Sequence, residues 1–328
     1  LAYRGGEPLK WVSLVVCILT FVFLSIYAAA QFAASGKALL GTFELPVWIG
    51  VLVGAVLVLA YCFAGGLRAT IWSNAAQSIV MIVAMVLLVG YGLSEVGGWG
   101  EAMTRWEAVD PSYLSWFAEV ADHWWLAPVF VVVGWVCFGI GTVGQPHIMV
   151  GYMTMDSGDN IRKVRAYYYS WYTAFYAAAI LVGMLARVIL DVPDTFDSEL
   201  ALPVMATKLF PDFLVGVMLA GIFAATISTA DSLVISCTGA LTNDVFPKFK
   251  FSYLASKVTT VLVTAFAVSV ALYSLYSETK VFDMVVNVWA VLGSAFGPLL
   301  IMILLGRRPN QVVSLLMIIL GAGSTLWF

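Results

Sequence analysis

The sequence has few charged residues. Asp, Glu, Lys and Arg make up 11% of its 328 residues, less than half of the roughly 25% that is typical of soluble domains. Apolar residues reach 62%, against about 45–50% in soluble domains. Because a water-soluble domain could not bury so much apolar surface, a soluble fold is excluded, and the same hydrophobicity excludes a disordered chain. The sequence predicts an all-α polytopic membrane protein.

Residues that bind metals or catalyse reactions are also scarce. The two histidines, His123 and His147, are far apart, and no CxxC spacing occurs. Four cysteines lie inside apolar runs, which predicts that they are small buried side chains: Cys17, Cys62, Cys137 and Cys237. HExxH, GxSxG and GxxxxGK[ST] patterns are missing, so we expect neither an enzyme nor an organic cofactor. A net charge of −3 also argues against a nucleic-acid partner.

Long apolar runs are abundant and predict about nine transmembrane helices. A bilayer core of roughly 30 Å needs about 20 apolar residues per helix. Windows of that kind cover residues 11–35, 46–64, 70–93, 124–150, 166–190, 212–238, 256–275, 281–304 and 310–328. The second and third windows are separated only by AGGLRAT, in which Gly65 and Gly66 are predicted to turn the chain and Arg68 to mark the membrane face.

Lys and Arg orient these helices, because they concentrate on the cytoplasmic side. With the N-terminus inside, the cytoplasmic loops hold Arg4, Lys10, Arg68, Arg162, Lys163, Arg165, Lys248, Lys250, Lys257, Arg307 and Arg308. The outer loops hold the remaining five of the 16 basic residues. Nine helices then place the C-terminus outside, in a multi-pass protein of the cell (inner or plasma) membrane. The chain lacks an initiating Met and ends inside an apolar run, so we expect it to be the middle of a longer protein.

One helix carries a stripe of small polar side chains. In LAGIFAATISTADSLVIS (219–236), helical periodicity places five residues on one face: Ala225, Ser228, Thr229, Ser232 and Ser236. Such a stripe can serve close helix packing, with hydroxyls bonded back to their own helix. Asp231 lies near its edge, where a carboxylate is costly unless it is paired, solvated or bound to a cation. Hydroxyl, carbonyl and carboxylate oxygens suit a hard cation, which favours a cation site over packing alone.

Three further segments depart from simple apolar helices. In CFGIGTVGQPHIM (137–149), three glycines and Pro146 predict either a kinked helix or a broken one of the kind that lines transporter sites. WAVLGSAFGP (289–298) is rich in small residues and predicts helix packing rather than a moving gate. Asn74 and Gln77 enter the third window within GGLRATIWSNAAQ (65–77), and Gly50 with Gly54 forms a GxxxG packing pattern.

At these places the chain resembles the sodium:solute symporter family, most closely its sodium/proline symporter branch. The matching segments are YCFAGGLRATIWSNAAQ (61–77), GQPHIMVGYMTMDS (144–157), LAGIFAATISTADS (219–232), LTNDVF (241–246) and VWAVLGSAFGP (288–298). They follow the family's order and spacing over essentially the whole chain. The resemblance implies a LeuT-like fold, which has two five-helix inverted repeats. Residues 1–328 would then form a single, partial transporter domain that runs from the third to the tenth core helix and one accessory helix.

The resemblance also implies functional residues. Sodium ligands would be the carbonyl of Ala225 and the hydroxyls of Ser228 and Thr229, with Asp231 as a further candidate. The broken helix would line the solute site through Phe138, Thr142, Gln145 and Pro146. Phe138 and Thr142 replace a Trp and a Tyr of the proline branch, which favours another small organic solute. Asn74 stands where many members carry an Asp, and together with Ser232 it marks a candidate second cation site.

The expected function is sodium-coupled symport of a small organic solute, an amino acid such as proline or a related carboxylate, by alternating access. Sodium, the solute and the lipid bilayer are the expected partners, and no obligatory protein partner is inferred. Two alternatives remain at this point. One is a symporter-like sensor domain of a histidine kinase, and the other is a proton-coupled carrier that uses Asp231.

Overall fold

The computed structural model describes residues 3–4, 7–110, 112–115, 117, 126–153, 155, 157–193, 195–245 and 252–327, and of residues 65–69 it describes the backbone. Several sequence-based expectations concern positions outside this set: His123, the side chain of Arg68, and the motif residues Thr154, Asp156 and Phe246. The described part is almost entirely helical. A short hairpin near the N-terminus pairs β1 (Tyr3–Arg4) with β2 (Glu7–Pro8), with Tyr3 opposite Pro8.

The helices follow one another along the chain. They are α1 (Lys10–Phe43), α2 (Val47–Val96), α3 (Trp99–Val109), α5 (Ala127–Ile140), η1 (Gly141–Gly144), α6 (Pro146–Met153), η2 (Gly158–Asn160), α7 (Ile161–Ile189), η3 (Ser198–Leu200), α8 (Ala201–Leu209), α9 (Asp212–Ala240), η4 (Leu241–Val245), α10 (Tyr253–Tyr276), α11 (Val281–Leu304) and α12 (Gln311–Trp327). Local chemistry explains several ends. Glu44, in the left-handed region with φ of 57°, and Pro46 separate α1 from α2. The Ser252 hydroxyl accepts the backbone N–H of Ala255 and begins α10.

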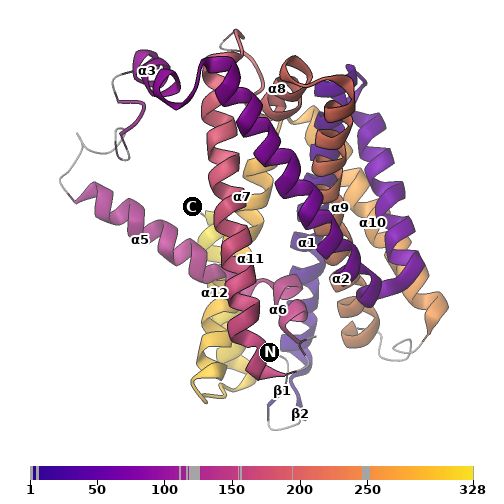
Figure 1. Cartoon of the computed structure of the whole chain (residues 1–328). Coiled ribbons are helices and arrows are strands. Elements are labelled where there is room, and N and C mark those ends of the chain that lie inside the picture. Colours follow the sequence, from indigo (N-terminus) through magenta and orange to yellow (C-terminus); the bar gives the residue numbers. More distant parts are fainter. Residues whose placement is uncertain are drawn as a thin grey trace.

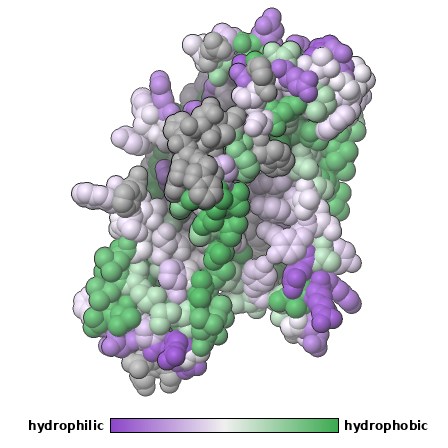
Figure 2. All heavy atoms as spheres, turned by 90° about the vertical axis from the view of Figure 1, so that its left-hand side faces the viewer, coloured by the Kyte–Doolittle hydropathy of each residue, from purple (hydrophilic) through white to green (hydrophobic). Residues whose placement is uncertain are grey.

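The chain is a multi-pass membrane protein. Eight helical segments in the described residues are long and apolar enough to cross a bilayer. The ninth predicted segment forms α12, which has 17 residues and is shorter than this length. Its predicted window, 310–328, begins one residue before α12, and Phe328 lies outside the described residues. Figure 2 shows hydrophilic residues near the two ends of the molecule and a more apolar band between them, as a transmembrane bundle requires.

Helix α2 holds two of these segments and bends sharply between them (Figure 1). The predicted reversal at residues 65–69 is therefore confirmed, although the backbone stays helical and no loop forms. Gly54 packs on Ser35, whose hydroxyl donates to Thr226 on α9, while Asn74 contacts the Ser228 carbonyl on the same helix. In a straight helix, residues 54 and 74 would lie about 30 Å apart. A bend is therefore needed to bring both close to neighbouring residues of α9, Thr226 and Ser228.

The core lies around α1, which contacts α2, α9, α10 and α11. The predicted Gly50 packing pattern is confirmed, because a Cβ on Gly50 would lie 2.6 Å from the Gly36 Cα of α1. A second apolar cluster joins the later half of α2 to α7, α8 and the start of α9. Cys17, Cys62 and Cys237 are buried as predicted. Cys137 is exposed, and this prediction was wrong because α5 projects sideways from the bundle with no buried residue (Figure 1).

The fourth predicted span is a broken helix, α5–η1–α6. Its joint packs directly on α11: a Cβ on Gly144 would lie 2.7 Å from the Leu292 carbonyl oxygen and 2.9 Å from the Gly293 Cα. Gly293 in turn packs against Gly141. The small residues of segment 289–298 therefore serve close packing, as their composition predicted.

An ion-pair cluster joins α1, η3 and α11 at one end of the bundle. Lys37 Nζ lies 2.6 Å from Asp197 Oδ2 and 2.5 Å from Glu199 Oε2. The Glu199 carboxylate also accepts the backbone N–H groups of Val281 and Phe282, which begin α11 and lack partners within that helix. Partial burial alone would raise the pKa of Asp197. Hydrogen bonds from Lys37 and the Glu199 N–H, with the charges of Lys37 and Lys280, outweigh this and lower the pKa below its ordinary value. Ionised Asp197 therefore stabilises the fold at neutral pH, and this contribution is lost as the pH falls through the lowered pKa.

Glu199→Ala should destabilise the protein by about 1–2 kcal/mol, because it leaves Lys37 with one carboxylate and two N–H groups of α11 without an acceptor. Glu101→Ala is the matched control, since Glu101 pairs with Arg105 at a site where both side chains are about half exposed. That change should alter stability by less than about 0.5 kcal/mol. Thermal unfolding in detergent compares the two variants, and equal effects would contradict the proposed role of Glu199.

Gly144→Ala should destabilise the protein by about 1–3 kcal/mol, because the new Cβ meets backbone atoms of α11 that cannot move independently. Gly139→Ala provides the comparison, since a Cβ there has nothing within 4 Å. Alanine favours a helix interior by about 0.5–1 kcal/mol over glycine, so this control should be neutral or stabilising. Unfolding temperatures that fall equally in both variants would disprove the tight contact at Gly144.

Candidate functional site

The polar stripe on α9 forms one continuous line of oxygen atoms. The hydroxyls of Ser228 and Thr229 both donate to the Ala225 carbonyl, each at 3.0 Å. Further along, Ser232 donates to the Ser228 carbonyl at 3.0 Å and Ser236 donates to the Ser232 carbonyl at 2.8 Å. The stripe predicted from periodicity is therefore real. Its hydroxyl hydrogens are all used within the helix, whereas the hydroxyl oxygens keep lone pairs with which they can accept or ligate.

The later half of α2 presents a second set of polar groups to α9. Thr70, Asn74 and Gln77 follow helical spacing, so they share one face of α2. Asn74 Nδ2 lies 3.5 Å from the Ser228 carbonyl oxygen, and Thr70 faces Asp231. Asp231 Oδ1 accepts from the Ser232 hydroxyl at 3.2 Å. We refer to Thr70, Asn74, Gln77, Asp231 and Ser232 as the α2–α9 oxygen cluster.

This cluster contains buried acceptors that have no partner among the described residues. They are Asp231 Oδ2 and the Asn74 and Gln77 amide oxygens. Asp231 is fully buried, and the ion pairs found in the described residues do not include it. An unpaired carboxylate inside a membrane bundle costs several kcal/mol. A group of unsatisfied oxygens around a buried negative charge is therefore suited to bind a cation.

The type of ligand restricts the type of cation. The described residues contain no group of three His, Cys, Asp or Glu side chains that could hold a metal ion. Carbonyl, hydroxyl, amide and carboxylate oxygens are the available atoms, and these suit hard cations rather than soft transition metals. The structure keeps Ala225, Ser228, Thr229 and Ser232 on one half-buried stripe of α9, with Asp231 fully buried at its edge. Asn74 of α2 reaches this stripe at the Ser228 carbonyl.

The broken helix places the predicted solute residues beside α11. Gln145 is fully buried at the end of η1, and its Nε2 donates to the Trp289 carbonyl at 3.1 Å. Phe138 stacks on the Trp289 ring with centroids 6.2 Å apart. The Thr142 carbonyl accepts the backbone N–H of Gln145, and Pro146 begins α6. All four residues thus lie along one joint.

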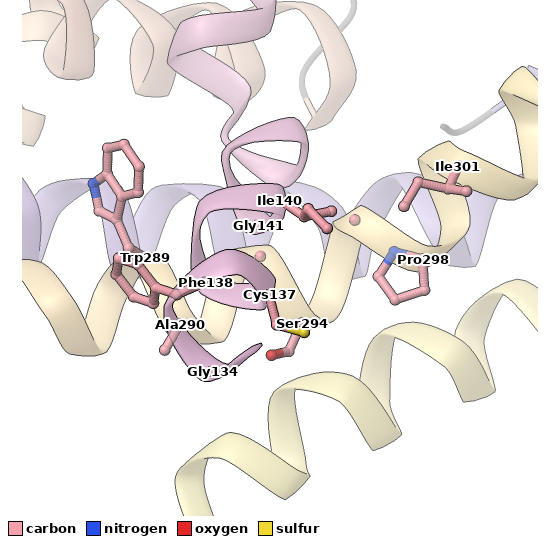
Figure 3. A pocket seen from close by; sticks show the side chains of 12 residues that line it. Gly134, Cys137, Phe138, Ile140, Gly141, Trp289, Ala290, Ser294, Pro298 and Ile301 are labelled. Atoms are coloured by element: carbon pink, nitrogen blue, oxygen red, sulfur yellow. The ribbon is translucent and has the colours of Figure 1, made fainter. Parts of the chain in front are cut away.

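A cavity of about 410 Å³ lies between α5 and α11. Figure 3 shows Phe138 and Cys137 of α5 and Trp289 and Ser294 of α11 around it. Its walls are largely aromatic or glycine surfaces, with a single hydroxyl group from Ser294. Phe138 lines this cavity, whereas Thr142, Gln145 and Pro146 are not among its lining residues. The cavity could accept a small, mostly apolar solute.

Sequence reasoning missed three side chains near this joint. Tyr27 of α1 packs edge-on against His147 with ring centroids 5.7 Å apart, and Trp289 lies beside Tyr27. His147 Nδ1, Trp289 Nε1 and Gln145 Oε1 are buried without a partner in the described residues. Trp289 lies in segment 289–298, whose small residues predicted close helix packing, so the sequence did indicate that this segment faces another helix. Tyr27 stands in an ordinary apolar helix, and only the packing of α1 reveals it.

Comparison with known proteins agrees with this architecture. A model of the sodium:solute symporter family matches residues 1–321. The osmoregulated proline transporter OpuE of Bacillus subtilis is 26% identical over 320 residues, covering 95% of this chain and 63% of the relative. The sodium/proline symporter of Escherichia coli is 25% identical over 329 residues, covering 97% of this chain and 64% of the relative. This chain therefore spans less than two thirds of the length of these relatives.

A solved structure shares the fold. A Na⁺-coupled sialic acid symporter in a substrate-bound, outward-open state matches with a TM-score of 0.66 and 18% identity. The match covers 96% of this chain and 74% of the other. The predicted transporter fold is thereby confirmed. The family model covers nearly the whole chain, including the joint and the oxygen cluster described above. The chain belongs to the sodium:solute symporter family, a family of transporters rather than of enzymes.

Proposed function

We propose that this protein couples the movement of sodium to the uptake of a small organic solute by alternating access. The observation that carries the proposal is the stripe of Ala225, Ser228 and Thr229 oxygens on α9, which the α2–α9 oxygen cluster adjoins through Asn74 at the Ser228 carbonyl. Two curated relatives are named as sodium/proline and proline transporters. In this proposal residues 1–328 form one transporter domain that contains core helices three to ten and one accessory helix.

Sodium is the favoured coupling ion because it binds oxygen ligands, which α9 supplies, and because the Asp231 carboxylate can balance its positive charge. The Ala225 carbonyl and the two hydroxyls supply three oxygens within about one helical turn. Asp231, Ser232 and Asn74 would supply a second group next to the Ser228 carbonyl. A cation there would offset the buried charge of Asp231, which the described residues leave without an ion pair. We assign no further cofactor.

The proposed solute is an amino acid such as proline or a related carboxylate. The aromatic faces of Phe138 and Trp289 suit a compact apolar ring, and buried polar atoms at the joint can bind its charged or polar end. Phe138 and Thr142 differ from the aromatic pair expected for proline itself. They are therefore the positions at which solute choice can be tested.

Ser228→Ala combined with Thr229→Ala should raise the sodium concentration for half-maximal uptake at least about tenfold, because two ligand oxygens are lost. Alanine preserves the helix, so protein level and unfolding temperature should change little. The measurement is initial uptake in proteoliposomes at a series of sodium concentrations. Thr264→Ala with Ser269→Ala removes two hydroxyls that bond back within α10 in the same manner, and it should leave the sodium dependence unchanged.

Two results would reject this assignment. One is an unaltered sodium dependence in the Ser228/Thr229 variant. The other is uptake by the unaltered protein that follows a pH gradient and ignores sodium, which would favour a proton-coupled carrier with Asp231 as the charged group. The first result would exclude only Ser228 and Thr229 as sodium ligands, whereas the second would exclude sodium as the coupling ion.

Phe138→Trp combined with Thr142→Tyr should shift solute preference toward proline, by about tenfold in the ratio of uptake efficiencies. Larger aromatic rings narrow the space at Phe138, and the tyrosine hydroxyl would reach further from the joint than that of Thr142. Competition of radiolabelled uptake by a panel of amino and carboxylic acids measures the shift. Val132→Ile, on an exposed part of α5, is the control. An inhibition profile identical to that of the unaltered protein would exclude Phe138 and Thr142 from the solute site.

A further inference from the structure

A lysine of α10 contacts the backbone of α2 just before its bend. Lys257, one turn into α10, donates from Nζ to the carbonyl oxygens of Cys62 at 3.3 Å and Phe63 at 2.9 Å. Its ammonium group also lies 4.5 Å from the centre of the Phe63 ring and 5.2 Å from that of Tyr253. These contacts join α10 to the last residues before the bend (Figure 1).

The chemistry of a bent helix explains why a cation is favourable there. Carbonyl groups next to a sharp bend tilt away from the helix axis and lose part of their intrahelical hydrogen bonding. The end of the first half of α2 also carries the partial negative charge of a helix C-terminus. Lys257 provides both hydrogen-bond donors and a positive charge, and the Phe63 and Tyr253 ring faces further favour the ammonium group.

The bend in turn sets the position of the α2–α9 oxygen cluster. Thr70 follows Phe63 by about two helical turns with the bend between them, and Asn74 follows by one more turn. Beyond the bend, Thr70 faces Asp231 and Asn74 reaches the Ser228 carbonyl. A small rotation at the bend would therefore move the α2 oxygens relative to Asp231 and the Ser228 carbonyl.

We propose that Lys257 is a positioning residue for cation binding: by clamping the Cys62 and Phe63 carbonyls, it keeps Thr70 and Asn74 facing Asp231 and Ser228. The inference rests on the proposed function of that cluster and adds α10 to the elements that determine it. Lys257 itself touches neither the cation residues nor the solute residues in the contacts described for it.

The test compares two lysines with the same chemistry at different places. Lys208 Nζ donates to the Ile189 carbonyl at 2.7 Å, at the end of α7 and away from the oxygen cluster. Lys257→Met and Lys208→Met each remove a positive charge from a helix end and keep most of the apolar stem. Lys257→Arg keeps the charge and the donors.

Lys257→Met should raise the sodium concentration for half-maximal uptake at least about fivefold, because it removes both charge-assisted hydrogen bonds to α2. The solute concentration for half-maximal uptake at saturating sodium should stay unchanged. Lys257→Arg should restore the sodium value to within about twofold, and Lys208→Met should not alter it. An unchanged sodium value in Lys257→Met, or an equal change in Lys208→Met, would overturn the inference.

A second measurement tests the bend without transport. Cys62 is buried beside the clamp, so a small maleimide should label it several-fold faster in Lys257→Met than in Lys208→Met, as quantified on its peptide by mass spectrometry. Equal labelling in the two variants would overturn the clamp. If the unaltered protein shows no sodium-dependent uptake, the proposed function fails, and the labelling rates still decide whether Lys257 holds the bend.

Discussion

The contact between the later half of α2 and α9 is the constraint on which the remaining site depends. It exists only because α2 bends, so that residues on both sides of the bend reach one level of α9. Small residues allow this approach, since Gly221 of α9 lies against Ala84 of α2. The same face then encloses a fully buried carboxylate, Asp231, among oxygens that lack partners in the described residues. The α2–α9 interface is thus closely packed and also contains buried oxygens without hydrogen-bond partners in the described residues.

The joint of the broken helix is the second close contact, and it differs in kind. Gly141 and Gly144 pack backbone against backbone on Leu292 and Gly293, so the joint leaves little space for rearrangement on that side. The aromatic cavity lies next to this contact, and α5 beyond it has no buried residue. A rigid joint that carries an exposed apolar helix positions Phe138 and Gln145 against α11 at Trp289.

Much of this arrangement could be predicted from residue patterns. Apolar runs located the spanning helices, and the 100° periodicity of α9 placed Ala225, Ser228 and Thr229 on one stripe. Glycines and Pro146 located the break between α5 and α6. The prediction that Cys137 is buried failed because helix packing, rather than local hydrophobicity, determines exposure.

The sequence by itself determined the class of the protein, the helices and the chemistry of the α9 stripe, because composition and periodicity are local properties. Only the tertiary structure decided which residues meet across the bundle. Tyr27 and His147, or Lys257 and the Cys62 carbonyl, lie more than 100 residues apart along the chain and carry no shared pattern. Their contacts follow from the bend of α2 and the packing of α1. Both depend on the close packing of many side chains from several helices.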